Sequence, residues 1–333
     1  MIWLIVLAAG LAAGAGWMTW MPGKSVRGPL PVLSDPERKL SGRLESDVRT
    51  LSVEIGERNV FTPDSMSRTV DWIEERMREA GYSPQRRTYE LGGSSATELA
   101  GHPALNLVAE LPGSERPGEV VIIGAHYDSV VRSPGANDNA SGIAALLALA
   151  EWFRERPQPR TIRFVAFANE EPPMFASSDM GSHAYAAHSR GVGEGITAMM
   201  SMDGIAYFSD EPGSQRYPLP GLDLIYPTRG NFIGFVTRAG DARLLREAIG
   251  AFREQASIPS EGAALPGGMP GVGWSDHWAF WQHDYSAFLV TDTLPFRDPH
   301  YHTPGDTADR LDYDRLARVV HGLKAVIAKL AGA

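Results

Sequence analysis

EVVIIGAHYDS, at residues 119–129, gives the strongest indication of the fold of this chain. Its first seven residues form an apolar run rich in β-branched side chains, which is typical of a buried strand. From Ala140 the run ASGIAALLALAEWFRE has a helical pattern, and TIRFVAF at 161–167 is another buried strand. Strands that alternate with helices in this way favour a mainly parallel sheet.

The same alternation extends along the chain and predicts one α/β domain. We expect a three-layer sandwich, in which a mainly parallel mixed sheet carries helices on both faces. Two stretches dense in Gly and Pro, 206–231 and 257–274, are predicted to be loops around a substrate cleft. The amphipathic run at 311–330 predicts a C-terminal helix. The further strand-like runs are RRTYEL (86–91), LNLVAEL (105–111), ITAMMSM (196–202) and SAFLVTD (286–292).

Two helices are expected before the first strand. Asp35 before Pro36 is predicted to cap the first helix, and Thr62 before Pro63 the second, because proline suits the first helical turn. The second helix should end at Gly81, since glycine commonly follows a helix C-terminus.

The chain opens with an apolar run that has no charged side chain before Lys24. About 20 helical residues at about 1.5 Å each match a hydrocarbon core of about 30 Å. Residues 1–20 are therefore expected to be a transmembrane anchor, or a signal segment cut near Ala13-Gly14-Ala15. We expect a cell-envelope protein, anchored or exported to the periplasm or the exterior. Lys24 and Arg27 argue against export, because basic residues that follow an apolar run favour a cytoplasmic location of the domain after it.

The expected organisation therefore has three parts. They are the membrane or signal segment at 1–20, a Pro/Gly-rich linker at 21–34 and a catalytic domain at 35–333.

Composition excludes several chemistries. With 31 Lys and Arg against 40 Asp and Glu, the net charge of −9 argues against a nucleic-acid partner. The chain has no cysteine, which excludes disulfides, thiolate metal ligands and a cysteine nucleophile. No G-x-S-x-G nucleophile motif and no HExxH zinc motif is present. A metal site in this chain must use His, Asp and Glu.

Three of the expected strands end in side chains that can bind metal. His126 and Asp128 follow the first strand quoted, Glu170 and Glu171 follow TIRFVAF, and Asp203 follows ITAMMSM. Ligands bind beyond the carboxyl ends of strands in open α/β sheets, so these groups should meet at one edge. Carboxylates brought so close repel one another, and divalent cations remove the repulsion.

A count of charges favours two cations. Asp138, Glu171 and Asp203, together with one hydroxide, supply four negative charges, and neutral His126 and His302 complete the ligand sets. Asp138 can bridge because a carboxylate has two oxygens.

Two neighbouring carboxylates are expected to act without binding metal. Glu170, next to a ligand, is expected to be the general base. Asp128 is expected to accept the second ring N–H of His126 and fix its tautomer.

At these residues the chain resembles the family 28 zinc metallopeptidases, which include bacterial two-zinc aminopeptidases. The resemblance runs from about residue 45 to the C-terminus. It is carried, in family order, by GAHYDSV, PGANDNASG, FANEE, MGSHAYA, MDGIAY, YPTRGNF, SDHWAFW and YHTPGDT.

The resemblance implies a zinc exopeptidase-like fold, two Zn²⁺ per chain, and a peptide or protein N-terminus as substrate. It implies one zinc on His126, Asp138 and Asp203, and the other on Asp138, Glu171 and His302. Glu170 would be the base.

The family pattern also implies features around the ligands. One is a cis peptide bond between Asp138 and Asn139, and another is a Tyr301 hydroxyl that polarises the scissile carbonyl or stabilises the oxyanion. Asp128 would support the ligands from outside the metal sites, and Ser275-Asp276-His277 would lie near the cleft in a supporting role.

Two other functions remain open. A glutaminyl cyclase uses similar ligands, but its usual aromatic residue before the last ligand is Trp, whereas this chain has Tyr301. A non-catalytic ectodomain normally loses ligands, and all five, with the base, are present here. Both features favour the peptidase.

Overall fold

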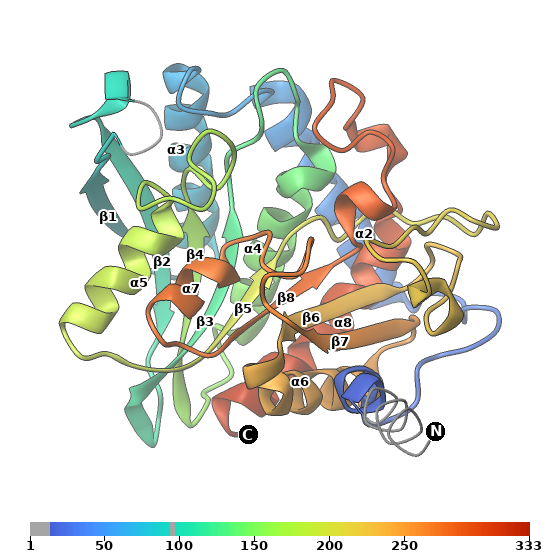
Figure 1. Cartoon of the computed structure of the whole chain (residues 1–333). Helices are drawn as coiled ribbons and strands as arrows, with labels where there is room; N and C mark the ends of the chain where they lie inside the picture. Colours follow the sequence, from blue (N-terminus) through green and yellow to red (C-terminus); the bar gives the residue numbers. More distant parts are fainter. Residues whose placement is uncertain (1–13, 94–96) are drawn as a thin grey trace, which may run out of the picture.

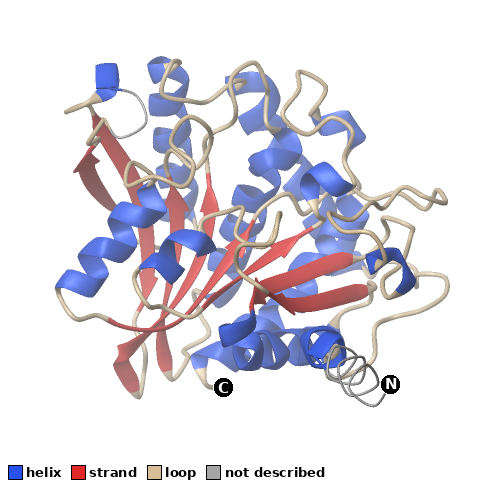
Figure 2. Ribbon diagram, viewed as in Figure 1, coloured by secondary structure: helices blue, strands red, loops and turns tan. Residues whose placement is uncertain are grey.

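The computed structural model describes residues 14–93 and 97–333, and its centre is a single mixed sheet of eight strands (Figures 1 and 2). Across the sheet the order is β1-β2-β4-β3-β5-β8-β6-β7. In chain order the strands are β1 (Gln85–Glu90), β2 (Pro103–Leu111), β3 (Arg116–His126), β4 (Arg160–Phe167), β5 (Gly195–Met202), β6 (Ile233–Arg238), β7 (Ser260–Leu265) and β8 (Ala287–Thr291).

The middle of the sheet is parallel. Strands β4, β3, β5 and β8 run in one direction, so their carboxyl ends share one edge. β1 pairs with β2, β2 with β4, and β6 with β8 in antiparallel fashion, whereas β6 and β7 are parallel to each other. The predicted mainly parallel mixed sheet is confirmed.

Helices cover both faces, as expected for a three-layer sandwich (Figure 2). The larger core lies where α4, α6 and α8 pack against the sheet, with α2 and α3 on α4. A smaller core, around Phe167 and Phe280, lies between the opposite face and the helices α5 and α7. The helices are α2 (Asp35–Arg49), α3 (Pro63–Glu79), α4 (Gly142–Phe153), α5 (Gly181–Gly191), α6 (Ala242–Gln255), α7 (His277–Gln282) and α8 (Tyr313–Ala331).

All six strands predicted from the sequence are present, but two more were not predicted. β7 lies inside the stretch 257–274 that was predicted to be a loop, and that part of the prediction is wrong. Its sequence, SEGAAL, lacks β-branched and aromatic residues, so local preference gives no strand signal. Pairing with β6 and packing against α6 hold it in place.

The helix starts are close to those expected. Ser34, and not Asp35, caps α2, because its hydroxyl accepts from the Glu37 backbone while the Glu37 carboxylate accepts from the Ser34 N–H at 2.8 Å. α3 begins at Pro63 as predicted. It is followed by Gly81 at a φ of +88°, a conformation that glycine adopts without strain.

Of the apolar N-terminal run, residues 1–13 lie outside the described part. Residues 14–19 are helical and lie on α6, where Arg246 donates to the carbonyl groups of Trp17 and Trp20. Within 14–93 and 97–333, no helix combines the length and apolarity that a bilayer crossing needs.

The stretch 21–34 has no regular secondary structure, yet it is attached to the domain. Met21 is buried, Arg253 donates to the Pro22 carbonyl at 2.9 Å, and the Ser25 hydroxyl accepts from the Ser260 N–H at 2.9 Å. The limits of the three predicted parts stay predictions.

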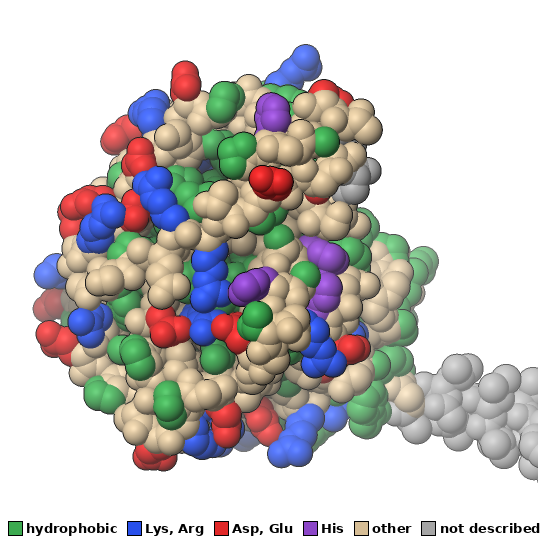
Figure 3. Space-filling model, turned by 90° about the vertical axis from the view of Figure 1, so that its left-hand side faces the viewer, with side chains coloured by type: hydrophobic (Ala, Val, Ile, Leu, Met, Phe, Trp, Pro, Cys, Tyr) green, Lys and Arg blue, Asp and Glu red, His purple; other side chains and the backbone are tan. Residues whose placement is uncertain are grey.

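Acidic and basic side chains are interspersed over the face of the molecule that Figure 3 shows. This face therefore has no extended field of one sign, such as a basic field that would attract nucleic acid.

Candidate metal centre

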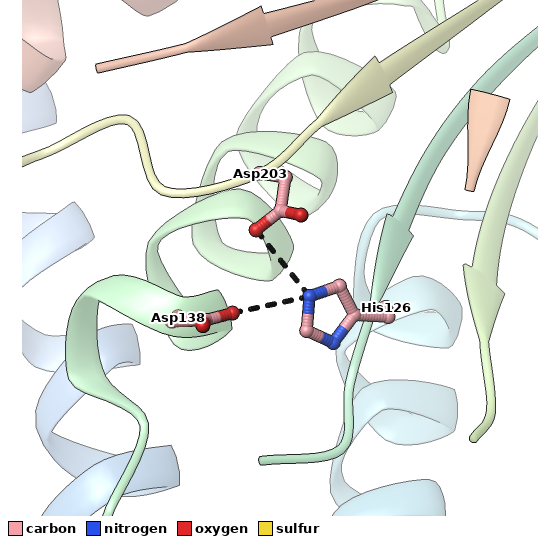
Figure 4. A group of neighbouring side chains, drawn as sticks. All are labelled: His126, Asp138 and Asp203. Atoms are coloured by element: carbon pink, nitrogen blue, oxygen red, sulfur yellow. Dashed lines mark hydrogen bonds and ion pairs between the residues drawn. The ribbon is translucent and has the colours of Figure 1, made fainter. Parts of the chain in front are cut away.

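The predicted metal-binding residues meet at the carboxyl edge of the parallel strands. His126 is the last residue of β3, Glu170 and Glu171 follow β4, and Asp203 directly follows β5. Asp138 comes from the turn that leads into α4. Figure 4 shows the Asp138 and Asp203 carboxylates directed at the His126 ring from these different elements.

One group of possible ligands consists of His126, Asp138 and Asp203. The His126 Nε2 atom lies 3.2 Å from Asp138 Oδ1 and 3.4 Å from Asp203 Oδ1 (Figure 4). All three residues are buried. One nitrogen and two carboxylate oxygens form a donor set that suits zinc.

The second group consists of Asp138, Glu171 and His302. The His302 Nε2 atom lies 3.2 Å from Asp138 Oδ2 and 3.0 Å from Glu171 Oε2. Although buried, this nitrogen makes no hydrogen bond of normal geometry with the described residues. A ring nitrogen that faces two carboxylates without bonding either is arranged as a metal ligand, so these residues fit a cation. Asp138 belongs to both groups through its two oxygens.

The ionisable groups of the centre shift one another's pKa values, because they are buried close together. Burial, together with the charge of Asp138, raises the pKa of Glu171 to about 8. Burial by itself would lower the pKa of His302, but the adjacent carboxylates outweigh this effect and raise the pKa to about 10. A cation bound by these atoms would replace that proton, because metal binding requires the neutral imidazole.

Glu170 belongs to neither group. Its Oε2 atom lies 3.9 Å from His126 Nε2, beside the first group. Burial raises the pKa of Glu170 well above its usual value, and the charges of Asp203 and Glu171 act in the same direction. A carboxylate beside the ligands but outside both sets can accept a proton from a molecule bound between them.

Asp128 connects two of the segments that supply ligands. Its Oδ1 atom lies 3.4 Å from His126 Nδ1 and accepts from the Glu170 N–H at 3.2 Å. Its Oδ2 atom accepts from the Glu171 N–H at 3.0 Å. The hydrogen bond of His126 Nδ1 is to the Asp128 backbone carbonyl at 3.2 Å, so the predicted role of the Asp128 carboxylate on this ring stays a prediction. The bonds to the glutamate pair were not predicted.

Asp306 holds the backbone of Asp138, the residue common to both groups, and this contact was not predicted from the sequence. Its two carboxylate oxygens accept from the backbone N–H groups of Asn137, at 2.7 Å, and Asp138, at 3.1 Å. The peptide bond from Asp138 to Asn139 is cis, as the family resemblance implies. Asp306 lies only four residues after His302 in YHTPGDT, so the motif itself contained a signal.

Arg58 was not predicted either. This arginine is fully buried, and its guanidinium donates to the backbone carbonyls of Leu51, Gly56, Tyr127, Pro134 and Gly135. It therefore ties together both ends of the loop between β3 and the turn that carries Asp138. Nothing in the local sequence around Arg58 shows these contacts, because the bonded loop lies about 70 residues later.

Tyr301 forms part of a cleft of about 340 Å³ over the ligands. Its ring stacks on the His302 ring, with 3.7 Å between the ring centroids. Phe175 and Trp274 complete the apolar rim of the cleft. A substrate in the cleft therefore meets both ligand groups and the Tyr301 side chain.

The Ser275-Asp276-His277 segment is fully buried. Ser275 bonds the Ser201 hydroxyl on β5 at 3.1 Å, and the His277 ring bonds the Val272 carbonyl at 2.8 Å. Burial raises the pKa of Asp276 to about 7. The segment packs behind the ligands and does not line the cleft, so its supporting role stays a prediction.

The chain belongs to a family of metallopeptidases. Residues 106–327 match the model of peptidase family M28. The matched range includes both ligand groups, Glu170 and Tyr301.

Two proteins have sequences similar to most of this chain. The chain is 37% identical over 298 residues to the uncharacterized protein YfbL of Escherichia coli (strain K12), covering 87% of this chain and 88% of YfbL. It is 26% identical over 286 residues to a probable leucine aminopeptidase 1 of Trichophyton verrucosum (strain HKI 0517), covering 81% of this chain and 69% of that protein.

Solved structures share the fold. A zinc aminopeptidase from Bacillus subtilis matches with a TM-score of 0.67 at 16% identity, covering 90% of this chain and 95% of that one. A glutaminyl cyclase from Fimbriiglobus ruber matches with a TM-score of 0.60 at 20% identity, covering 93% and 99%. The fold is therefore common to both reactions and does not choose between them.

Proposed function

We propose that this chain is a zinc-dependent exopeptidase, specifically an aminopeptidase that hydrolyses the N-terminal peptide bond of peptides or proteins. The observation that carries the proposal is the pair of ligand groups that share Asp138, with Glu170 beside them and part of neither. Membership of a metallopeptidase family supports the hydrolysis, and the aminopeptidase relatives support cleavage at the N-terminus.

In this proposal two zinc ions bind per chain. His126, Asp138 and Asp203 would hold one ion, and Asp138, Glu171 and His302 the other. Two such ions would supply a Lewis acid and would lower the pKa of bound water toward about 7.

In this proposal the protein side chains transfer the proton, stabilise the developing charge and orient the His126 ring. Glu170 takes a proton from the attacking water and returns it to the leaving amine, since its carboxylate lies beside the ligands. The Tyr301 hydroxyl donates to the oxygen of the scissile carbonyl as negative charge develops there. Asp128 keeps the His126 ring in the orientation that leaves Nε2 free for metal.

A panel of substrates tests the proposal. The purified full-length chain, loaded with zinc, should release the N-terminal residue from aminoacyl-chromophore substrates. A chelator should abolish this activity, and added zinc should restore it. Substrates with a blocked N-terminus and carboxypeptidase substrates should remain intact.

The same panel includes N-terminal glutaminyl peptides, which separate the rival functions. Formation of a cyclic pyroglutamyl product without hydrolysis of the other substrates would show a glutaminyl cyclase. A chain that binds zinc and processes nothing in the panel would be a non-catalytic ectodomain, and the proposal would be rejected.

We also propose that the protein works at the cell envelope, either anchored or exported. The support is the uncharged apolar run before Lys24. After cell fractionation, the full-length chain should sediment with membranes, or appear outside the cytoplasm in a shortened form. A variant that begins at residue 21 should remain in the cytoplasm. Recovery of the intact full-length chain from the cytosol would refute the proposal.

A further inference from the structure

A second cavity lies beside the candidate metal centre, over the face of β8, β6 and β7. Trp274 and Tyr301 line both this cavity and the cleft that contains the ligands. Its volume of about 110 Å³ suits one side chain rather than a length of peptide, given that a cavity of about 150 Å³ holds a benzene molecule. A residue bound at the centre can therefore direct its side chain past Tyr301 into this space.

The floor of the cavity is a row of residues across three strands. In the strand register Thr291 of β8 pairs with Gly234 of β6, and Gly234 pairs with Glu261 of β7. Neighbouring strands lie about 4.8 Å apart, so the Glu261 backbone lies about 10 Å from that of Thr291. Gly234 has no side chain, so no Cβ projects from the floor between these two residues.

The alternation of side chains along β7 directs Glu261 into the cavity. Its neighbour Ser260 faces α6, where the Ser260 hydroxyl accepts from Arg253 at 3.1 Å. Side chains of successive strand residues point to opposite faces, so Glu261 faces the cavity that it lines.

Aromatic rings line the walls of the cavity. The hydroxyls of Tyr217 and Tyr226 donate to the carbonyls of Pro227, at 2.6 Å, and Gly262, at 3.0 Å. Trp274 and Phe296 are stacked, with their ring centroids 6.1 Å apart. Because the tyrosine hydroxyls are engaged elsewhere, the walls are largely apolar and Glu261 is the single acid among the lining residues.

The Glu261 carboxylate is half-buried and has no hydrogen bond or ion pair within 14–93 and 97–333. Burial raises its pKa, while the charges of Arg253 and Arg27 act in the opposite direction. Arg253 lies on the other face of β7 and donates to Ser260 and to the Pro22 carbonyl instead. A half-buried carboxylate without a partner is costly, and a cation that entered the cavity would offset the cost.

We propose that this cavity binds the side chain of the substrate's N-terminal residue, and that Glu261 selects a lysine or arginine there. This inference rests on the proposed aminopeptidase function. The aliphatic stem of a lysine would lie against the aromatic walls, and its ammonium group would pair with Glu261 at the far end. An arginine would use the same walls and could bond the carboxylate through two N–H groups.

Norleucine provides a matched probe, because it retains the lysine stem and lacks the ammonium group. The ratio of kcat/KM for lysyl to norleucyl substrates should exceed about tenfold in the wild type. It should fall by about the same factor in Glu261→Gln, which keeps the shape of the side chain and removes its charge. Glu254→Gln, a change at an exposed position on α6, is the control and should leave the ratio unchanged.

A binding measurement separates this inference from the proposed function. By calorimetry, the full-length chain should bind lysinamide about tenfold more tightly than norleucinamide, and Glu261→Gln should bind the two alike. Equal binding in the wild type would overturn the inference even if peptides are cleaved. Selective binding without cleavage of any substrate would reject the peptidase, and it would still show that Glu261 selects a basic side chain in this cavity.

Arg216 allows a test of the opposite specificity, for an acidic side chain. It lines the same cavity, and its side chain is exposed to solvent. A preference for glutamyl substrates that disappears in Arg216→Gln would show that the cavity selects acidic side chains, and would overturn the inference.

Discussion

Glu170→Gln is expected to lower kcat by about 10²- to 10⁴-fold, the usual contribution of a general base. The amide has the size of the carboxylate and cannot take a proton from water. Because Glu170 belongs to neither ligand group, the variant should retain the metal content of the wild type. The measurement is kcat on the best aminoacyl substrate together with elemental analysis of the same sample.

Glu155→Gln is the matched control, since Glu155 is exposed and lies after α4, outside the centre. It should retain both activity and metal. Two results would contradict the assignment of Glu170. Wild-type turnover in Glu170→Gln would mean that another group moves the proton, and loss of metal would mean that Glu170 is a ligand.

Asp138→Asn should reduce the bound metal from about two ions per chain to one or fewer, and activity should fall with it. The side-chain amide supplies no negative charge and one oxygen in place of two, so it cannot serve both groups. The bond from the residue 138 backbone N–H to Asp306 does not depend on the side chain, so the local backbone should persist. Elemental analysis after dialysis, with urea unfolding as a check on the fold, gives the answer.

The control for this change is Asp309→Asn, at an exposed turn before α8. It removes the same charge and should leave the metal content unchanged. If Asp138→Asn kept two ions per chain and remained active, the two groups would not share a ligand, and the bridging role would be wrong.

Most of the sheet could be predicted from the sequence because its strands are continuous apolar runs. β3, β4 and β5 are covered on both faces, so nearly every position is hydrophobic and the local signal is strong. β7 gave no such signal, since its small residues form a strand only through pairing with β6 and packing on α6. Local sequence cannot report contacts of that kind.

The candidate ligands could be predicted for a related reason. A buried strand that ends in His or a carboxylate places that group at a known edge of the sheet, so the strand pattern alone groups His126, Glu171 and Asp203. The groups that hold these ligands in place could not be found in this way. Arg58 and Asp306 act on the turn that carries Asp138 from about 80 and about 170 residues away along the chain.

The candidate metal-binding residues follow from the sequence alone, because a chain without cysteine has only His, Asp and Glu for the purpose and the strand pattern places them. The separate positions of these residues around the centre depend on the tertiary fold. It directs the two oxygens of Asp138 to different histidines, leaves Glu170 outside both groups, and pairs Glu261 with Gly234 on the floor of the second cavity. Strand register and long-range hydrogen bonds set these relations, and they exist only once distant segments pack together.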